Sequence, residues 1–387
     1  MRVIQYLSRF RAEDGGVQQS VQDLSALLAA SGHEVRLLTG GPEGLPQSWR
    51  SQKPGQPTIV ALSPWRSTSR LSAADRDVVR EQIAWAQLLH MHAPWDLRGM
   101  AIGVEARRAR RPYILAVHGM LDDWTMRHRA LKKRIFLAFG GSRYIRRADL
   151  LQCSSAVEVE QAGRWARGAR FGVAPLPIDE VQLVGLASTP KPARSDDLSG
   201  AVAPRRLLFL GRIDPIKGIE DAITVISRLW EVGIGAQLDI AGTGDAGYVE
   251  SLRALARTKL VAERVHFHGH VRGDAKCALL RDAELLILPS RHENFGLALV
   301  EALAWGTPVV TTRAVNIWRE LEASGGATIV PALAVDCLHD AVHRLLADCV
   351  ALREQGVRGQ QWVGDTFSPA QVAARYEALY RAIVPSA

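Results

Sequence analysis

Short apolar runs alternate with helix-patterned stretches along this chain, and this alternation limits its fold more than any other feature. Near the N-terminus, the apolar run Val3–Leu7 precedes a glycine pair, then Val17–Ala30 with apolar residues at helical spacing, then a second run at Glu34–Leu38. A strand, a helix and a further strand in this order form a βαβ unit, which requires parallel strands. The sequence therefore predicts an α/β fold with a parallel sheet in its first half.

The second half of the chain repeats this order after a segment rich in Pro, Ser, Ala and Gly, which we interpret as a linker. We predict a first domain over residues 1–185, the linker over 186–204, a second domain over 205–366 and a final helical segment over 367–387. The expected strands of the second half are Arg206–Leu210, Gln237–Ala241, Val265–Phe267, Leu285–Pro289 and Pro308–Thr311, separated by helices at Gly218–Val232, Tyr248–Leu260, Ala275–Ala283 and Gly296–Trp305. Two doubly wound domains of this kind hold ligands at the carboxyl ends of their strands.

Composition narrows the class of protein further. The chain has 387 residues, a length that suits two domains, and its 47% hydrophobic and 23% charged content excludes a disordered chain. No apolar run approaches the roughly 18 residues that a membrane-spanning helix needs, and Val3–Leu7 is short for a secretory leader. We therefore expect a cytoplasmic protein.

Positive charge is concentrated in one segment. The chain carries 48 basic and 40 acidic residues, a net charge of +8. The segment Arg98–Arg147 alone holds 13 basic and 3 acidic residues, a net charge of +10, so it accounts for the whole excess. This balance predicts an anionic partner for the first half: nucleic acid, a membrane surface or a phosphorylated substrate.

One group of polar residues surrounds the expected strand that ends at Pro289. Glu293 lies in the loop after this strand, Asn294-Phe295-Gly296 opens the next helix, and Glu301 follows one to two turns into it. The backbone N–H groups at the start of a helix suit a phosphate, and two carboxylates beside it can accept hydrogen bonds from sugar hydroxyls. The alternative is that both glutamates are solvated acids near a helix end.

A second group follows the strand that ends at Leu210. Arg212 and Lys217 bracket a turn that opens a helix at Gly218, and both can reach a diphosphate. Arginine suits bidentate contacts with phosphate oxygens, whereas lysine acts as a point charge. The alternative is an ordinary exposed basic turn.

These two groups together resemble the motifs of retaining glycosyltransferases of family 4. Glu293 and Glu301 resemble the E-x7-E motif of that family, and Arg212 with Lys217 is similar to its diphosphate-binding pair. The resemblance implies the GT-B fold, in which two facing Rossmann-like, doubly wound domains are joined by a C-terminal helix that crosses back to the first domain.

The resemblance extends into the first half and implies a role for each matching residue. Gly15-Gly16 resembles the N-terminal glycine loop of the family, and His118-Gly119 resembles its active-site histidine. The catalytic group would be His118, Arg212, Lys217 and Glu293. The donor would be bound by Gly16, Arg212, Lys217, Asn294, Phe295, Gly296, Leu297 and Glu301.

The activity that the resemblance implies is retaining transfer of a hexose from a nucleotide-diphosphate sugar. The acceptor would be a glycan or a polyprenyl-diphosphate-linked glycan in exopolysaccharide or lipopolysaccharide biosynthesis. We expect no metal and no cofactor besides the nucleotide-sugar substrate. Two alternatives stay open: a nucleotide-sugar epimerase of GT-B fold, and a non-catalytic nucleotide-sugar-binding protein.

The basic segment suggests where the acceptor is found. Lys132, Lys133 and Arg134 are interleaved with apolar residues just after His118, and we predict that they dock on anionic lipid at the inner face of the plasma membrane. The alternative is a solvated helix with an apolar face towards the core. Nucleic acid is not expected as a partner, because the segment has no recognised binding motif.

Two weaker motifs favour ordinary structural roles. The alternating histidines of 266–270 share one face of an expected strand, but the sequence offers them no acidic or cysteine partner for a metal. Residues 242–247 match G-x-G-x-x-G, but the next expected strand does not end in the acidic residue that a dinucleotide ribose needs.

Overall fold

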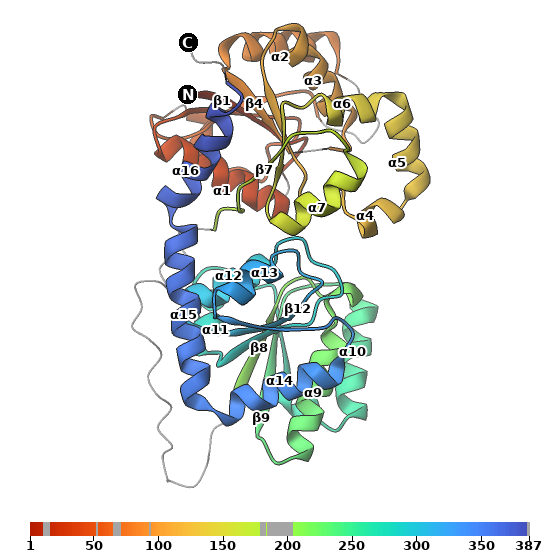
Figure 1. Cartoon of the computed structure of the whole chain (residues 1–387), viewed down its shortest axis with the longest axis vertical. Coiled ribbons are helices and arrows are strands. Elements are labelled where there is room, and N and C mark those ends of the chain that lie inside the picture. Colours follow the sequence, from red (N-terminus) through yellow and green to blue (C-terminus); the bar gives the residue numbers. More distant parts are fainter. Residues whose placement is uncertain are drawn as a thin grey trace. The chain divides into compact units, whose positions relative to one another are not determined.

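The computed structural model describes residues 1–10, 16–51, 53–64, 71–92, 94–178, 183 and 204–384, so nearly all of the expected linker lies outside the described residues. The chain forms two compact units, one of Met1–Pro177 with Pro369–Ala387 and one of Ile178–Ser368. Each unit has a single parallel sheet with helices on its faces (Figure 1). The predicted α/β fold class is therefore confirmed.

The sheet of the first unit has seven parallel strands in the order β3-β2-β1-β4-β5-β6-β7. Its middle strands are buried along their length, as expected for a sheet covered by helices on both faces. The strand order reverses between β1 and β4, which places a switch point at their carboxyl ends. The strands are β1 (Arg2–Tyr6), β2 (Glu34–Thr39), β3 (Thr58–Ala61), β4 (Leu88–Met91), β5 (Tyr113–Ala116), β6 (Leu150–Cys153) and β7 (Phe171–Val173).

The helices of the first unit include one from the far end of the sequence. The last helix, α16 (Pro369–Arg381), packs Val372, Tyr376 and Tyr380 into a core cluster shared with β1 and α1, and Figure 1 shows it beside α1. The helix therefore crosses back, as predicted. The other helices are α1 (Gly16–Ala30), α2 (Ala73–Trp85), α3 (Leu97–Arg108), α4 (Asp123–Arg127), α5 (Ala130–Phe136), α6 (Ser142–Arg146) and α7 (Ala156–Trp165), with a π-helical turn at Leu137–Gly141 and a 3-10 turn at Gln47–Ser51.

The second unit repeats the plan with six parallel strands in the order β10-β9-β8-β11-β12-β13. Here the order reverses between β8 and β11. The strands are β8 (Arg205–Leu210), β9 (Ala236–Ala241), β10 (Val265–Gly269), β11 (Leu285–Leu288), β12 (Val309–Thr312) and β13 (Ala327–Val330). The helices are α9 (Ile219–Glu231), α10 (Ala246–Thr258), α11 (Gly273–Asp282), α12 (Leu297–Ala304), α13 (Trp318–Ala323), α14 (Val335–Ala347) and α15 (Cys349–Phe367), with 3-10 turns at Pro215–Lys217 and Ala262–Arg264.

The end of the chain differs in one detail from the expected single helix that begins at Phe367. Instead, α15 ends at Phe367 and α16 begins at Pro369, with Ser368 extended between them at φ −56° and ψ 146°. A proline ring disfavours helical geometry in the residue before it, and this explains the break. The break coincides with the boundary between the two units.

Candidate active site

Lys217 and Glu293, predicted from separate motifs, meet in an ion pair in the second unit. A close approach between two loops brings them together. Gly218 has φ +67°, and a Cβ at this position would lie 2.4 Å from the carbonyl oxygen of Pro289, so only glycine fits. The turn that carries Lys217 therefore packs directly on the loop that carries Glu293. Both side chains are largely shielded from solvent.

The backbone of Glu293 is anchored on the loop that follows the neighbouring strand β12. Its N–H donates to the Ala314 carbonyl at 3.0 Å, and its carbonyl accepts from the Asn316 N–H at 2.9 Å. The Asn316 side chain also donates to Oδ1 of Asn294 at 3.2 Å. These bonds hold the segment before α12 in one conformation, so the position of the Glu293 carboxylate does not depend on a mobile loop.

The start of α12 offers backbone donors. Gly296 caps the helix at φ +76°, where a Cβ would lie 2.9 Å from Leu299 Cδ1, and this cap has no side-chain hydrogen bond. The amide of Leu297 is thus at a helix start that suits an anion. Phe295 is buried and makes an edge contact with Phe367, so its ring belongs to the core and only its backbone faces this site.

Glu301 has a partner that the sequence analysis did not identify. The Lys276 ammonium, from α11, lies 2.7 Å from Oε1 of Glu301, and both side chains are mostly buried. Lys276 belongs to no recognisable motif, so only the packing of α11 against α12 reveals it. Arg212 is not brought into this group. Its side chain is 70% exposed and lies 3.5 Å from Asp214.

The match of residues 242–247 to a dinucleotide motif has a packing explanation. A Cβ on Gly242 would lie 1.8 Å from the Gly211 carbonyl oxygen, and one on Gly244 would lie 1.9 Å from that of Ile213. These glycines therefore let the loop after β9 pack on the Arg212 loop. Packing thus explains these glycines without a bound dinucleotide.

His118 follows β5 in the first unit, in a loop with a constrained backbone. It has φ +49°, a left-handed conformation that is unusual for a residue other than glycine, and Gly119 follows at φ +70°. The Gly119 N–H donates to the carboxyl of Glu158, which lies on α7 and is fully buried. Burial raises the pKa of Glu158. The buried Glu158 side chain therefore holds the His118 loop in place.

The His118 ring itself is hydrogen bonded to a second histidine. His118 Nε2 lies 2.9 Å from Nδ1 of His92, and His92 Nε2 lies 2.6 Å from the amide oxygen of Gln5. Burial lowers the pKa of His118 to about 4 and lowers that of His92 well below its usual value. Both rings are therefore neutral at pH 7. The sequence analysis did not identify Gln5, although a glutamine within an apolar strand was a visible signal.

Gly16 is the first residue of α1, and Gly15 lies outside the described residues. Among the described residues, no atom lies within 4 Å of a Cβ placed on Gly16. Contacts with that part of the chain therefore do not explain a glycine at this position.

The basic segment presents apolar side chains to solvent. Leu131 is 72% exposed, Ile135 50% and Phe139 79%, and α5 contains no buried residue. Lys132 and Arg134 are exposed between them. Lys133 is different, because its ammonium donates to the Thr125 carbonyl and lies over the Trp95 ring. Of the three predicted docking residues, Lys133 is therefore turned towards the protein.

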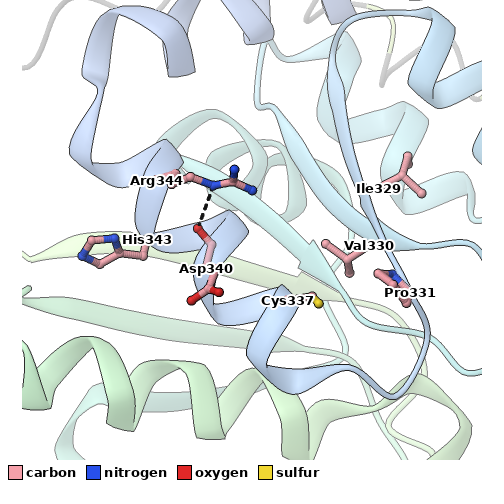
Figure 2. A pocket seen from close by; sticks show the side chains of 7 residues that line it. All are labelled: Ile329, Val330, Pro331, Cys337, Asp340, His343 and Arg344. Carbon is pink, nitrogen blue, oxygen red and sulfur yellow. Dashed lines mark hydrogen bonds between the residues drawn. The ribbon is translucent and has the colours of Figure 1, made fainter.

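Of the histidines of β10, His268 has an ordinary partner: its Nε2 lies 2.7 Å from the Asp239 carboxylate, which also pairs with Arg206. Within the described residues, no cluster of three or more His, Cys, Asp or Glu side chains could hold a metal ion. A hollow of about 470 Å³ lies beside β13 and α14 and is lined among others by Cys337 and His343 (Figure 2). This hollow contains none of the predicted site residues.

The two parallel sheets and the returning C-terminal helix define the GT-B class of glycosyltransferases. The solved structure of the Anabaena protein HepE with UDP-glucose matches with a TM-score of 0.73 at 17% identity, over 98% of this chain and all of that one. WaaG, a glycosyltransferase involved in lipopolysaccharide biosynthesis, matches with a TM-score of 0.69 at 16% identity, over 99% of this chain and 100% of that one. At these identities the likeness concerns the fold.

The family follows from the sequence. The model of glycosyl transferases group 1 matches residues 197–361, and that of the glycosyl transferase 4-like domain matches residues 15–177. The chain belongs to this glycosyltransferase family. Among its relatives are a glycogen synthase of Mycobacterium tuberculosis, 27% identical over 95% of this chain and 91% of that protein, and a phosphatidyl-myo-inositol mannosyltransferase of Mycobacterium leprae, 28% identical over 96% and 94%.

Among the described residues, no helix combines the length and apolar character that a bilayer crossing requires.

Proposed function

We propose that this glycosyltransferase transfers a hexose, with retention of configuration, from a nucleotide-diphosphate sugar to a glycan or lipid-linked glycan acceptor in surface polysaccharide biosynthesis. The observation that carries the proposal is the Lys217–Glu293 ion pair beside the start of α12, where the Gly296 cap supplies no side-chain hydrogen bond. A cation, a carboxylate and the helix-start amide of Leu297 then lie at the carboxyl edge of a parallel sheet. This is the combination that binds a diphosphate and an attached sugar.

The chemistry follows from the charge that develops during transfer. Breaking the anomeric C–O bond leaves an oxocarbenium-like sugar and adds negative charge to the departing diphosphate. Lys217 and the start of α12 at Leu297 stabilise that charge, and Arg212 is exposed enough to turn towards it. Fixed donors of this kind commonly lower a barrier by about 3 kcal/mol each. Glu293 accepts hydrogen bonds from the sugar, and Glu301 accepts them from the ribose.

Retention requires the acceptor hydroxyl to attack from the face that the diphosphate leaves. The acceptor oxygen forms the new bond to the anomeric carbon, and its proton passes to a diphosphate oxygen. In this proposal His118 contacts the transferred sugar as a neutral ring. Its low pKa supports that role, because a neutral imidazole can accept a hydrogen bond from a hydroxyl.

The class of donor and the pathway are supported by the neighbours in fold. HepE was solved with UDP-glucose, which supports a nucleotide-sugar donor for this chain. WaaG is involved in lipopolysaccharide biosynthesis, which supports a role in surface polysaccharides. The Mycobacterium leprae relative is named for a lipid acceptor, which supports an acceptor at a membrane.

We further propose that the segment from Arg127 to Arg147 docks on the anionic inner face of the plasma membrane. Leu131, Ile135 and Phe139 would enter the interface, while Lys132 and Arg134 would meet anionic head groups. The exposed apolar side chains favour this proposal over a solvated helix with its apolar face towards the core.

The test of the transferase proposal uses purified full-length protein. A thermal-shift screen of nucleotide sugars identifies the donor, because selective binding raises the melting temperature. Transfer of labelled sugar to a lipid extract then measures turnover, and NMR of the product reads the anomeric configuration. Lys217→Ala and Glu301→Ala should each lower turnover at least about tenfold. Arg257→Ala, which breaks a surface pair with Glu250, should leave turnover unchanged.

Each competing outcome is distinct. Wild-type turnover in both variants would refute the proposed site. Release of free nucleotide with an isomerised sugar and no acceptor would indicate an epimerase. Ligand binding without turnover under all conditions would indicate a non-catalytic binding protein.

A further inference from the structure

A line of hydrogen bonds, buried except at its His118 end, connects His118 to the last helix of the chain, entirely within the first unit. His118 bonds to His92, His92 to Gln5 at 2.6 Å, and Gln5 Nε2 to the hydroxyl of Tyr380 at 3.3 Å. Gln5 lies on β1, His92 directly follows β4, and Tyr380 lies on α16. Gln5, His92 and Tyr380 are all at or below 1% exposure. The family motifs do not include these three residues.

We propose that Gln5 and His92 are positioning residues that set the tautomer of His118, so that its Nδ1 carries a lone pair and faces the substrate as a hydrogen-bond acceptor. The role of His118 towards substrate rests on the proposed function. The tautomer itself does not, and it can be measured without any substrate.

The direction of the chain of bonds follows from the Gln5 amide. Its oxygen faces His92 Nε2, so that nitrogen must carry the hydrogen. A neutral imidazole has one N–H, which leaves His92 Nδ1 as an acceptor. The nitrogen that faces it, His118 Nε2, must then donate. The remaining nitrogen of His118, Nδ1, is therefore the one with the free lone pair.

This argument requires neutral rings, and the surroundings keep them neutral. Burial lowers the pKa of His92 and of His118, and the neighbouring His90 ring on β4, whose centroid is 4.2 Å from that of His92, opposes a further positive charge. From α16, Tyr376 and Tyr380 face this region, and burial raises the pKa of both, so they carry no charge. Glu158 approaches from α7 through the Gly119 amide.

Tyr380 completes the hydrogen bonding of the Gln5 amide. Its oxygen accepts from Gln5 Nε2, so its own hydrogen is free to go to His90 Nδ1 at 3.0 Å. Turning the amide over would require His92 and His118 to exchange tautomers together, because the Gln5 NH₂ would then face His92 Nε2. Through the Tyr380 hydroxyl, helix α16 thus takes part in the line of hydrogen bonds that sets which nitrogen of His118 is protonated.

The test is NMR of the full-length protein labelled with ¹⁵N-histidine, without substrate. Two-bond ¹H–¹⁵N correlations distinguish a protonated ring nitrogen from one with a lone pair. In the wild type, His118 should carry hydrogen on Nε2, with Nδ1 unprotonated, and should not titrate between about pH 5 and 8. Hydrogen on Nδ1 of His118 in the wild type would overturn the proposal.

Two variants test the cause. In Gln5→Met, His92 Nε2–H would lose its acceptor, so the chain should reverse and the ratio of the two His118 tautomers should change about tenfold or more towards Nδ1–H. Tyr380→Phe should move this ratio in the same direction by a smaller factor. Unchanged His118 signals in both variants would refute the positioning role. If Gln5→Met does not fold, Tyr380→Phe decides alone.

The matched control is Tyr376→Phe. This residue lies one turn away on the same helix, is equally buried, and donates instead to the Pro175 carbonyl at 3.1 Å. Loss of the Tyr376 hydroxyl should destabilise the unit as much as Tyr380→Phe does, but should leave the His118 tautomer unchanged. An equal effect of both variants on the tautomer would mean a general structural disturbance. The expected tautomer in a protein without transferase activity would instead refute the proposed function alone.

Discussion

The exposed apolar side chains of α5 and the following turn make the membrane proposal quantitative. We consider the triple change of Leu131, Ile135 and Phe139 to serine. Their exposed fractions of 72%, 50% and 79% together amount to about two whole side chains. Complete burial of one such side chain contributes about 1.5–3 kcal/mol, so the three together contribute about 3–6 kcal/mol in an apolar medium.

The lipid interface is only partly apolar, so we expect about 2 kcal/mol or more of this burial free energy to contribute to membrane binding. Since 1.4 kcal/mol corresponds to a factor of ten, the triple variant should partition onto vesicles about 30-fold less than the wild type. The assay is flotation with vesicles that contain anionic lipid, at several lipid concentrations. Reversing Lys132 and Arg134 to Glu should weaken binding to anionic vesicles and reduce its dependence on salt.

The control changes Leu260, Leu333 and Val350 to serine, because these residues are comparably exposed but scattered over the second unit. Lys133 is left intact in every variant, since its bond to Thr125 belongs to the folded structure. Equal flotation of the wild type and the α5 triple variant would refute the reasoning. An equal loss in the control variant would mean that apolar exposure in general, rather than this segment, drives binding.

Two further predictions concern stability. Burial lowers the pKa of His90 to about 3 and that of His118 to about 4, so the unfolded chain takes up protons first as the pH falls below about 6.5. Between pH 6 and 4, each histidine should therefore lower the free energy of unfolding of the first unit by about 1.4 kcal/mol per pH unit. In His90→Phe, native-state hydrogen exchange should show a shallower dependence of this free energy on pH. In the second unit, Gly218→Ala should destabilise more than Gly233→Ala, because both have positive φ but only the former would meet the Pro289 carbonyl. Equal melting temperatures of these two variants would contradict the close approach that brings Lys217 to Glu293.

The fold class was predictable because each buried parallel strand is a continuous apolar run with a helix-patterned stretch after it. The sequence analysis named no strand at β3, β6, β7 or β13. Of these, β13 (ATIV) is short, and three of its four residues are only partly buried, so its sequence carries little pattern. The break at Ser368 did have a signal in Pro369. The sequence analysis began the final helix at Phe367 and named no helix before it, so it missed α15 as well as its boundary with α16.

The candidate site was predictable one residue at a time but not as a set of contacts. Glu293 and Lys217 were recognised from local spacing, whereas their ion pair depends on a backbone contact between Gly218 and Pro289. Lys276 was missed because a lysine on an amphipathic helix is ordinary until the packing of the neighbouring helix is known.

Strand order explains how both units assemble their polar groups from distant parts of the chain. In the first unit β1 lies beside β4, so Gln5 is next to His90 in register and one bond from His92. In the second unit β8 lies beside β11, and the loops that follow these strands carry Lys217 and Glu293. Both groups lie where the strand order reverses, and a doubly wound sheet leaves a crevice between its helices at such a point.

This symmetry suggests how Gln5 could have been found without a structure. In the run VIQYL it is the single polar residue of an otherwise apolar strand, and a buried amide must bond to something. Once the order of strands and helices predicts a doubly wound sheet, the partner is expected at the end of the strand across the reversal, where His90 and His92 stand in an apolar run. In this unit, a polar residue within a central strand thus indicates the candidate site, because its neighbour across the reversal is also polar.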